Sequence, residues 1–85
     1  MGSMREVVTR LTDAVLHPDG SYRTSDGDVY WFNRAGDLHS EEGPTCLATD
    51  GPTWWLNGIH YSFEDWIKLA TIPDEDKMML RLQYE

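Results

Sequence analysis

Two stretches of this chain repeat one another, and the repeat limits the fold more than any other feature. The segment 26–33 reads DGDVYWFN, and the segment 50–57, 24 positions later, reads DGPTWWLN. Each begins with Asp-Gly, which favours a hairpin turn because glycine tolerates positive φ. The β-branched and aromatic residues that follow are typical of strands. The pattern predicts two serial β-hairpin units, at about residues 19–38 and 42–61.

A single hairpin is marginal in water, so two in series should form a larger sheet with an apolar face. Residues 4–16 carry apolar side chains at helical spacing and predict a helix that can cover this face. Ser62, followed by Asp65, predicts a second helix start. The expected fold class is α+β, an antiparallel β-meander of four or five strands flanked by an N-terminal helix and one or two C-terminal helices.

The last twelve residues, 74–85, suit two structures. A helix start is favoured by Pro73 and the acidic run after it, whereas the sequence LRLQY alternates like a strand. We favour a short helix, with a terminal strand as the alternative. The 85 residues predict a single domain over 4–85, and residues 1–3 are set aside as an expression remnant.

The chain is acidic, with fifteen Asp and Glu against seven Lys and Arg and a net charge of −8. This balance argues against direct nucleic-acid binding, which needs clustered basic residues. Residues 41–85 hold nine of the acids and three of the bases. These acids either stabilise the first turns of helices or form a face for a basic partner. With no apolar run of roughly 20 residues and no secretory signal, we expect a cytoplasmic protein without a membrane partner.

Residues that could support catalysis or metal binding lack the spacing that such chemistry needs. Cys46 is the one cysteine, has no basic neighbour in sequence, and is expected to be a buried small side chain. His39 and His60, with Glu41, could hold a metal ion, but no HxH, HxxxH or CxxC motif occurs. Each histidine is expected to bond the backbone of the next turn, and the Glu41-Glu42 pair to solvate one. We therefore expect no enzyme, metal or cofactor.

Consecutive aromatic residues divide between the two faces of a strand, because neighbours point in opposite directions. Trp31 and Trp55 are expected on one face, and Tyr30, Phe32 and Trp54 on the other. One face should pack under the helices. The other is either covered by the helices and the C-terminal segment or exposed. An exposed Tyr30–Trp54 patch would be a docking surface, since Trp and Tyr dominate interface energetics.

The repeat resembles one found in small proteins of tailed bacteriophages and large DNA viruses, in which a Trp-x-x-Asn-Gly core is followed by a His, an acidic pair and Gly-Pro. It is also loosely similar to the MORN repeat. The matching segments are WFNRAGDLHSEEGP at 31–44, the Asp-Gly at 50–51 and WWLNGIH at 54–60. Ser40 and Tyr61 stand where a basic residue usually follows the His. The family has no defined activity, and the resemblance implies a phage-type protein that acts in the host cytoplasm.

We therefore expect a non-enzymatic protein that binds a host protein partner and inhibits, for example, a bacterial defence or nucleic-acid-processing complex. One alternative is a homo-oligomeric structural or interaction module, such as a homodimer. Another is a DNA mimic that uses its acidic C-terminal half. The candidate partner-binding residues are Tyr30, Phe32, Glu41, Glu42, Trp54, Asp74, Glu75 and Asp76.

Overall fold

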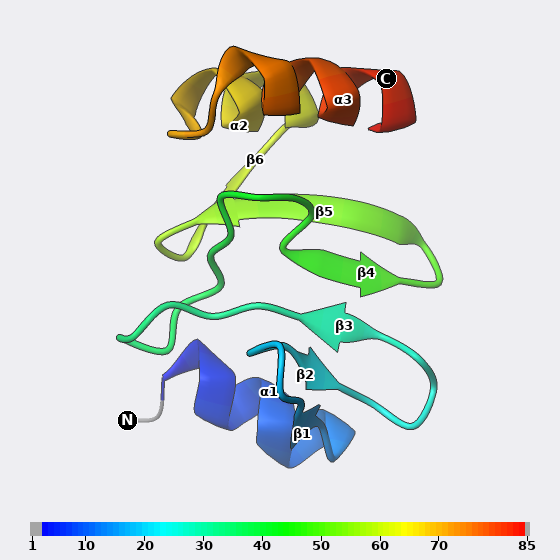
Figure 1. The fold of residues 1–85 in the computed structure, drawn as a ribbon. Coiled ribbons are helices and arrows are strands. Elements are labelled where there is room, and N and C mark those ends of the chain that lie inside the picture. The colour runs from blue at the N-terminus through cyan, green and yellow to red at the C-terminus, as the bar shows by residue number, and fades with distance from the viewer. Residues whose placement is uncertain (1–2, 85) are drawn as a thin grey trace.

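An antiparallel sheet occupies the middle of the molecule, with one helix at its N-terminal end and two at its C-terminal end (Figure 1). The computed structural model describes residues 3–84. The six strands follow chain order, so the predicted α+β meander is confirmed, with more strands than the four or five expected. The elements are α1 (Met4–Thr12), β1 (Val15–Leu16), β2 (Tyr22–Arg23), β3 (Val29–Tyr30), β4 (Cys46–Ala48), β5 (Gly51–Leu56), β6 (Ile59–Tyr61), α2 (Phe63–Leu69) and α3 (Asp74–Tyr84).

The N-terminal helix is shorter than the apolar spacing predicts, and the residues it loses form an extra strand. α1 ends at Thr12 because Asp13 adopts left-handed backbone geometry, with φ of 55°. Aspartate tolerates this region better than most residues. Val15 and Leu16 then pair with β2 as the edge strand β1. The prediction of a helix over 4–16 is wrong after Thr12, because pairing at the sheet edge satisfies the backbone in extended form.

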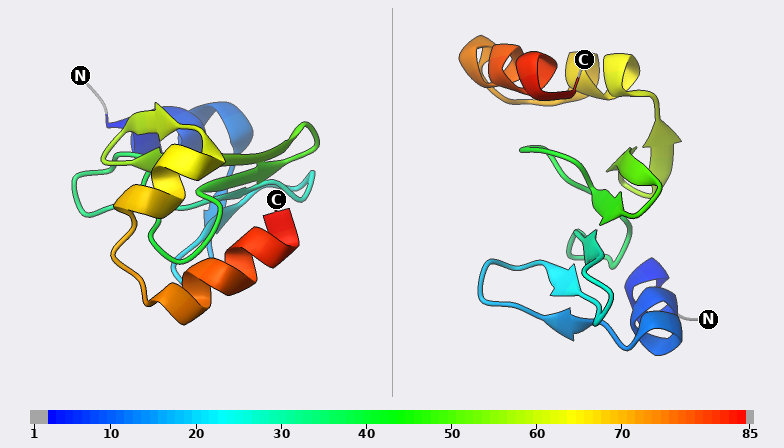
Figure 2. Two further views of the ribbon diagram at one scale, coloured as in Figure 1. Left: turned by 90° about the horizontal axis from the view of Figure 1, so that it is seen from above. Right: turned by 90° about the vertical axis from the view of Figure 1, so that its right-hand side faces the viewer.

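The helix α1 docks mainly through its first turn, and Val7 and Leu11 of its apolar stripe stay exposed. The Ser3 hydroxyl accepts a hydrogen bond from the Glu6 N–H at 3.3 Å, so a residue set aside as a remnant caps the helix. The Arg5 N–H donates to the Gly36 carbonyl at 2.8 Å. No described residue of α1 is buried, and Leu11 is 78% exposed. The expectation that α1 covers the sheet is wrong, and Figure 2 places it at the opposite end from α2 and α3.

A two-residue turn, Asn57 and Gly58, joins β5 to β6. Both residues have positive φ, 52° and 82°, as the two central residues of a type I′ turn require. The turn sets the register of the pair, with Trp54 opposite Tyr61 and Leu56 opposite Ile59. The predicted Asn-Gly turn and the strand that follows it are therefore confirmed.

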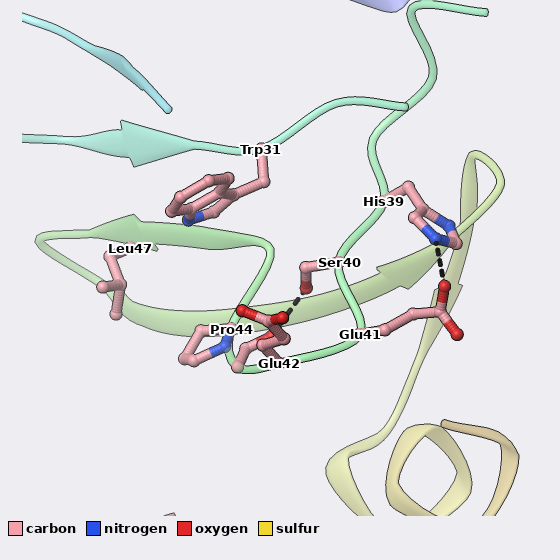
Figure 3. A pocket seen from close by; sticks show the side chains of 8 residues that line it. Trp31, His39, Ser40, Glu41, Glu42, Pro44 and Leu47 are labelled. Carbon is pink, nitrogen blue, oxygen red and sulfur yellow. Dashed lines mark hydrogen bonds and ion pairs between the residues drawn. The ribbon is translucent and has the colours of Figure 1, made fainter. Parts of the chain in front are cut away.

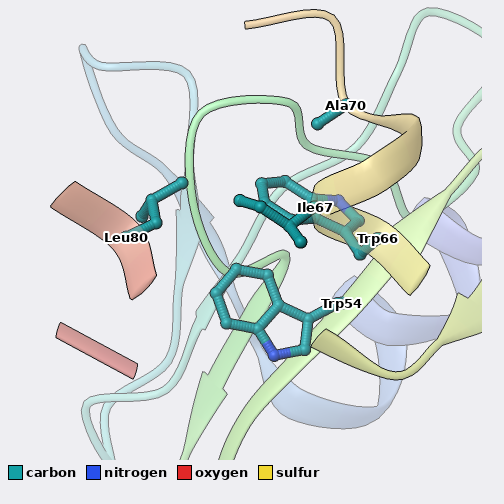
Figure 4. Packing of buried hydrophobic residues seen from close by; sticks show 5 residues of the cluster. All are labelled: Trp54, Trp66, Ile67, Ala70 and Leu80. Atoms are coloured by element: carbon teal, nitrogen blue, oxygen red, sulfur yellow. The ribbon is translucent and has the colours of Figure 1, made fainter. Parts of the chain in front are cut away.

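The hydrophobic core lies between β5 and the two C-terminal helices (Figure 4). Trp54 is only 5% exposed, and its ring centroid lies 4.7 Å from that of Trp66 and 5.2 Å from that of Tyr84. Ile67, from α2, and Leu80, from α3, are buried beside it. Each such side chain contributes roughly 1.5–3 kcal/mol by leaving water. The core therefore joins the second repeat to the C-terminal helices.

Both C-terminal helices begin where the sequence predicts. The Ser62 hydroxyl accepts a hydrogen bond from the Asp65 N–H at 3.2 Å and caps α2. The residues from Asp74 to Tyr84 form α3, so the favoured helix is confirmed and the terminal strand is wrong. Glu85 lies outside the described residues. Within residues 3–84, no helix is both long and apolar enough to cross a membrane.

The aromatic residues divide between the faces of the sheet differently from the prediction. Tyr30 lies opposite Cys46, Cys46 lies opposite Thr53, and the Thr53 hydroxyl accepts a hydrogen bond from the Trp55 indole N–H at 3.2 Å. These four side chains share one face, whereas Trp54 points into the helices on the other. The repeat aligns Tyr30 with Trp54, but the strand register aligns it with Thr53. An offset of one residue reverses the side-chain direction.

Candidate functional site

The two repeats hold a loop between them, formed by residues 39–45. The Asn33 amide donates to the Asn57 side-chain oxygen at 3.1 Å, which joins equivalent positions of the two copies. The Trp31 N–H donates to the Thr45 carbonyl at 2.9 Å, and the Ser40 N–H to the Trp55 carbonyl at 3.2 Å. The loop is thereby fixed at both ends to the tryptophan positions of the repeats.

Two hydroxyl groups hold the base of this loop. Thr45 is fully buried, and its hydroxyl accepts a hydrogen bond from the Trp55 N–H at 2.9 Å. The Ser40 hydroxyl lies 2.7 Å from that of Thr45 and donates to the Gly43 carbonyl at 2.6 Å. The Trp66 indole N–H donates to the Ser40 carbonyl at 3.0 Å, so the core helix α2 also supports the loop.

The first acid of the loop, Glu41, is used to hold the structure together. His39 Nδ1 accepts a hydrogen bond from the Asn57 N–H at 3.0 Å, which leaves the ring proton on Nε2. That Nε2 lies 3.1 Å from Glu41 Oε2, and Glu41 Oε1 accepts from the Thr71 hydroxyl at 2.5 Å. The bonds from Thr71 and His39 lower the pKa of Glu41. His39 therefore bonds the backbone of a turn, as expected, but it is the Asn57-Gly58 turn and not the next turn along the chain.

The second acid, Glu42, borders two adjoining clefts. It has no hydrogen-bond or ion-pair partner within residues 3–84. One cleft, of about 500 Å³, is lined by Trp31, Pro44 and Leu47 as well as the loop (Figure 3). The other, also about 500 Å³, is lined by residues of α3 and of the segment before it, namely Thr71, Ile72, Pro73, Asp76, Met79 and Leu80. Glu42 is the residue that lines both clefts.

The structure brings three of the predicted partner-binding residues to the two clefts, keeps two more beside them in α3, and separates only the aromatic ones from them. Glu41 and Glu42 lie in the loop, and Asp76 lines the second cleft. Asp74 and Glu75 are exposed in the same first turn of α3. We define the acidic surface as Glu42 and Asp76 with the two clefts.

The predicted aromatic patch does not form. Trp54 is buried under the helices, so the exposed Tyr30–Trp54 surface is wrong. Tyr30 is partly buried, and so is Phe32, whose ring centroid lies 5.4 Å from that of Tyr22 at an angle of 80°. Through β4, Tyr30 is in register with Thr53 and not with Trp54. The side chains of Tyr30 and Phe32 therefore point away from α2 and α3.

The aromatic residue that does line a cleft is Trp31. It stands between Tyr30 and Phe32 in sequence and points in the opposite direction, towards Leu47 (Figure 3). Trp31 and Trp55 therefore lie on opposite faces, against the prediction. Alternation of side chains at the end of β3 places Trp31 on the opposite face from Tyr30 and Phe32. Only the strand register shows which of the two faces carries the cleft.

The remaining candidates for chemistry have other roles in the structure. Cys46 is buried, as predicted, and burial raises the pKa of its thiol. His60 packs against Trp55, with ring centroids 4.9 Å apart. Within residues 3–84, no three His, Cys, Asp or Glu side chains are grouped so that they could hold a metal ion. The acidic surface thus offers carboxylates and apolar contacts, which suit binding.

Comparisons of the chain with protein-family models, with curated proteins and with solved structures found no match.

Proposed function

We propose that this protein is a non-enzymatic binding protein that docks through its acidic surface on a basic region of a protein partner. The observation that carries the proposal is the position of Glu42 between two clefts, as a carboxylate that has no partner within residues 3–84. Apolar clefts beside unpaired charge are typical of surfaces that bind a complementary partner. The resemblance of the repeat to phage proteins favours a host protein, such as a defence or nucleic-acid-processing complex that the docking would inhibit.

The charge of the surface favours a basic protein and disfavours direct contact with nucleic acid. Glu42 and Asp76 belong to separate elements, so their charges meet only in the folded chain. Complementary charge speeds association and selects partners, and salt weakens it. Capture of the partner should therefore decline as the salt concentration rises.

Capture from a bacterial host lysate with the tagged protein and matched charge variants tests the proposal. Reversing the charge of the acidic surface in Glu42→Lys/Asp76→Lys should abolish the recovery of a stoichiometric partner. The control, Asp26→Lys/Asp50→Lys, changes net charge by the same amount at two exposed hairpin-turn residues that line neither cleft. Unchanged circular dichroism of both variants confirms that each is folded.

Three results would count against docking through this surface. The first is that the native chain recovers no stoichiometric partner. The second is that the Glu42→Lys/Asp76→Lys variant still recovers it. The third is that the hairpin-turn control loses it to the same extent, which would indicate that net charge alone controls capture.

A second candidate function is self-association through the N-terminal end, because apolar side chains are exposed there beside an open sheet edge. β1 is an edge strand, and Val15 and Leu16 on it are more than half exposed. Leu11 lies on the neighbouring helix α1 and is exposed as well. Exposed edge strands can pair with another chain. Light scattering over a range of concentrations decides this, since a monomer mass at every concentration removes the candidate.

A further inference from the structure

The cleft beside Trp31 offers three kinds of contact to a partner. The Trp31 indole N–H has no hydrogen-bond acceptor within residues 3–84, and its nitrogen faces the cleft (Figure 3). Pro44 and Leu47 supply apolar contacts, with Leu47 38% exposed. Glu42 supplies an unpaired carboxylate. The cleft volume of about 500 Å³ lies within the usual range of ligand sites, roughly 300–1,000 Å³.

We propose that this cleft binds an arginine side chain on an extended segment of the partner, an inference that rests on the proposed function. A guanidinium group can stack on the indole ring of Trp31 while it donates hydrogen bonds to Glu42. The methylene stem of an arginine can pack on apolar residues such as Pro44 and Leu47. The Trp31 N–H then remains available for a peptide carbonyl of the same segment. Lysine is more strongly hydrated and lacks the planar face, so it fits this set of contacts less well.

The loop is held in place before any partner binds, which supports the assignment. Glu41 is bonded to both His39 and Thr71, so it anchors the loop and offers little to a ligand. Ser40 is bonded to Gly43 and to the buried Thr45 hydroxyl. Glu42 can therefore accept a guanidinium without breaking a hydrogen bond of the protein. A site already in its bound geometry loses less entropy on binding.

Nuclear magnetic resonance titration of the ¹⁵N-labelled protein tests the inference with N-acetyl-arginine methylamide as the probe. An exposed ion pair and one ring contact are each weak, so together they predict a dissociation constant on the order of tens of millimolar. The Trp31 indole signal and the backbone N–H signals of residues 42, 43 and 45–47 should shift. The indole signals of Trp55 and Trp66, whose N–H groups are bonded within the protein, should stay in place. The lysine analogue should bind several-fold more weakly, and the uncharged citrulline analogue roughly tenfold more weakly.

Two substitutions separate the site from nonspecific charge effects. Glu42→Gln keeps the shape of an exposed side chain and should weaken arginine binding by about five- to tenfold. Asp26→Asn removes the same charge from a hairpin turn and should leave the binding constant unchanged. Equal binding of the arginine, lysine and citrulline probes would overturn the inference, and so would unchanged affinity in Glu42→Gln. If the resonances of residues 42–47 shift with protein concentration alone, the occupant of the cleft is a second copy of the chain. That result would also overturn the inference.

The inference and the proposed function fail in distinguishable ways. Loss of lysate capture in Glu42→Lys/Asp76→Lys, without any shift of the Trp31 indole by the arginine probe, overturns the arginine site and leaves the proposed function standing. If the arginine probe binds at Trp31 but Glu42→Lys/Asp76→Lys still captures the partner, the arginine site is supported and the proposed function is overturned.

Discussion

At the scale of single residues, neighbouring or equivalent positions have different roles. Glu41 is bonded on both carboxylate oxygens, whereas Glu42, the next residue, has no internal partner within residues 3–84. His39 joins the loop to the Asn57-Gly58 turn, whereas its repeat equivalent His60 packs on the Trp55 ring. Both pairs look alike in the sequence. The two acids differ because Thr71, in the segment between α2 and α3, lies within hydrogen-bond distance of Glu41 only.

The tautomer of His39 is a testable consequence of this arrangement. The Asn57 N–H donates to Nδ1, so long-range ¹H–¹⁵N correlation at neutral pH should show an unprotonated Nδ1 and a protonated Nε2. His39→Ala should lower the free energy of unfolding in urea by about 1–2 kcal/mol, because it leaves two partners unsatisfied. His17→Ala, which removes no side-chain hydrogen bond among the described residues 3–84, should cost less than about 0.5 kcal/mol. A proton on Nδ1 would contradict the structure.

Asp19 predicts how stability depends on acidity. Hydrogen bonds from the Ser21 hydroxyl, at 2.6 Å, and the Ser21 N–H, at 3.0 Å, lower the pKa of Asp19 from 3.8 to about 2, with a smaller contribution from Arg23. In the unfolded chain Asp19 protonates near 3.8, so its contribution is complete above that pH and is lost as pH falls through about 2. Carbon-detected titration should show this midpoint. Ser21→Ala should move the midpoint towards 3.8, and an unchanged midpoint would contradict the assignment.

At the scale of elements, the contacts of each helix decide its role more than its own periodicity does. α1 has the cleaner apolar stripe, yet it meets the rest of the chain mainly through its first turn at Gly36. α2 and α3 enclose Trp54, because β5 presents that ring to them. An apolar stripe therefore indicates that a helix can form a contact, and the position of the helix decides whether the contact exists.

Gly36 provides a test of how α1 docks. Its φ is +86°, and a Cβ there would lie 2.5 Å from Ser3 Cβ and Oγ. Gly36→Ala should therefore cost left-handed strain of about 1–2 kcal/mol and, in addition, displace the start of α1. Gly27→Ala is the matched control, since Gly27 has φ of +92° with no atom within 4 Å. The midpoint of thermal unfolding should be lower for Gly36→Ala than for the control. Adding Ser3→Gly to Gly36→Ala should recover part of the difference. Equal midpoints would show that α1 does not dock closely at this glycine.

At the scale of the whole molecule, the two ends are stabilised differently. The clustered buried apolar residues belong to β5 and to the C-terminal helical region, whereas Val7 and Leu11 of α1 and both residues of β1 are exposed. Figure 2 shows these two groups at opposite ends of the sheet. Stability should therefore depend mainly on the C-terminal end, which also supports the loop of the acidic surface through Trp66 and Thr71.

Truncation of one apolar residue at each end tests this asymmetry. Ile67 is fully buried, so Ile67→Ala should lower the free energy of unfolding by about 2–5 kcal/mol. If that variant does not fold, Ile67→Val should still cost about 0.5–1.5 kcal/mol. Leu11→Ala removes a 78% exposed side chain and should change stability by less than about 0.5 kcal/mol. A large loss from Leu11→Ala, in urea unfolding of the monomer, would show that α1 packs in solution.

Much of the fold follows from local sequence, and much of the site does not. The Asp-Gly and Asn-Gly turns, the capped start of α2 and the third helix were predictable because each depends on residues a few positions apart. Glu41 and Glu42 could be named as candidates from charge alone. Trp31 and Leu47 on one side of Glu42 and Met79 on the other could not be assigned to these clefts, because strand register and helix placement bring such distant segments to Glu42.

The sequence by itself determined the repeated hairpins, the α+β class and the acidic charge, which are properties of short segments and of composition. Only the tertiary structure decided that Val15 and Leu16 leave the helix for the sheet, and that Trp54 is buried while Trp31 lines a cleft. The physical reason is the register of the strands. A shift of one residue reverses every side chain of a strand, and pairing between distant segments sets that shift.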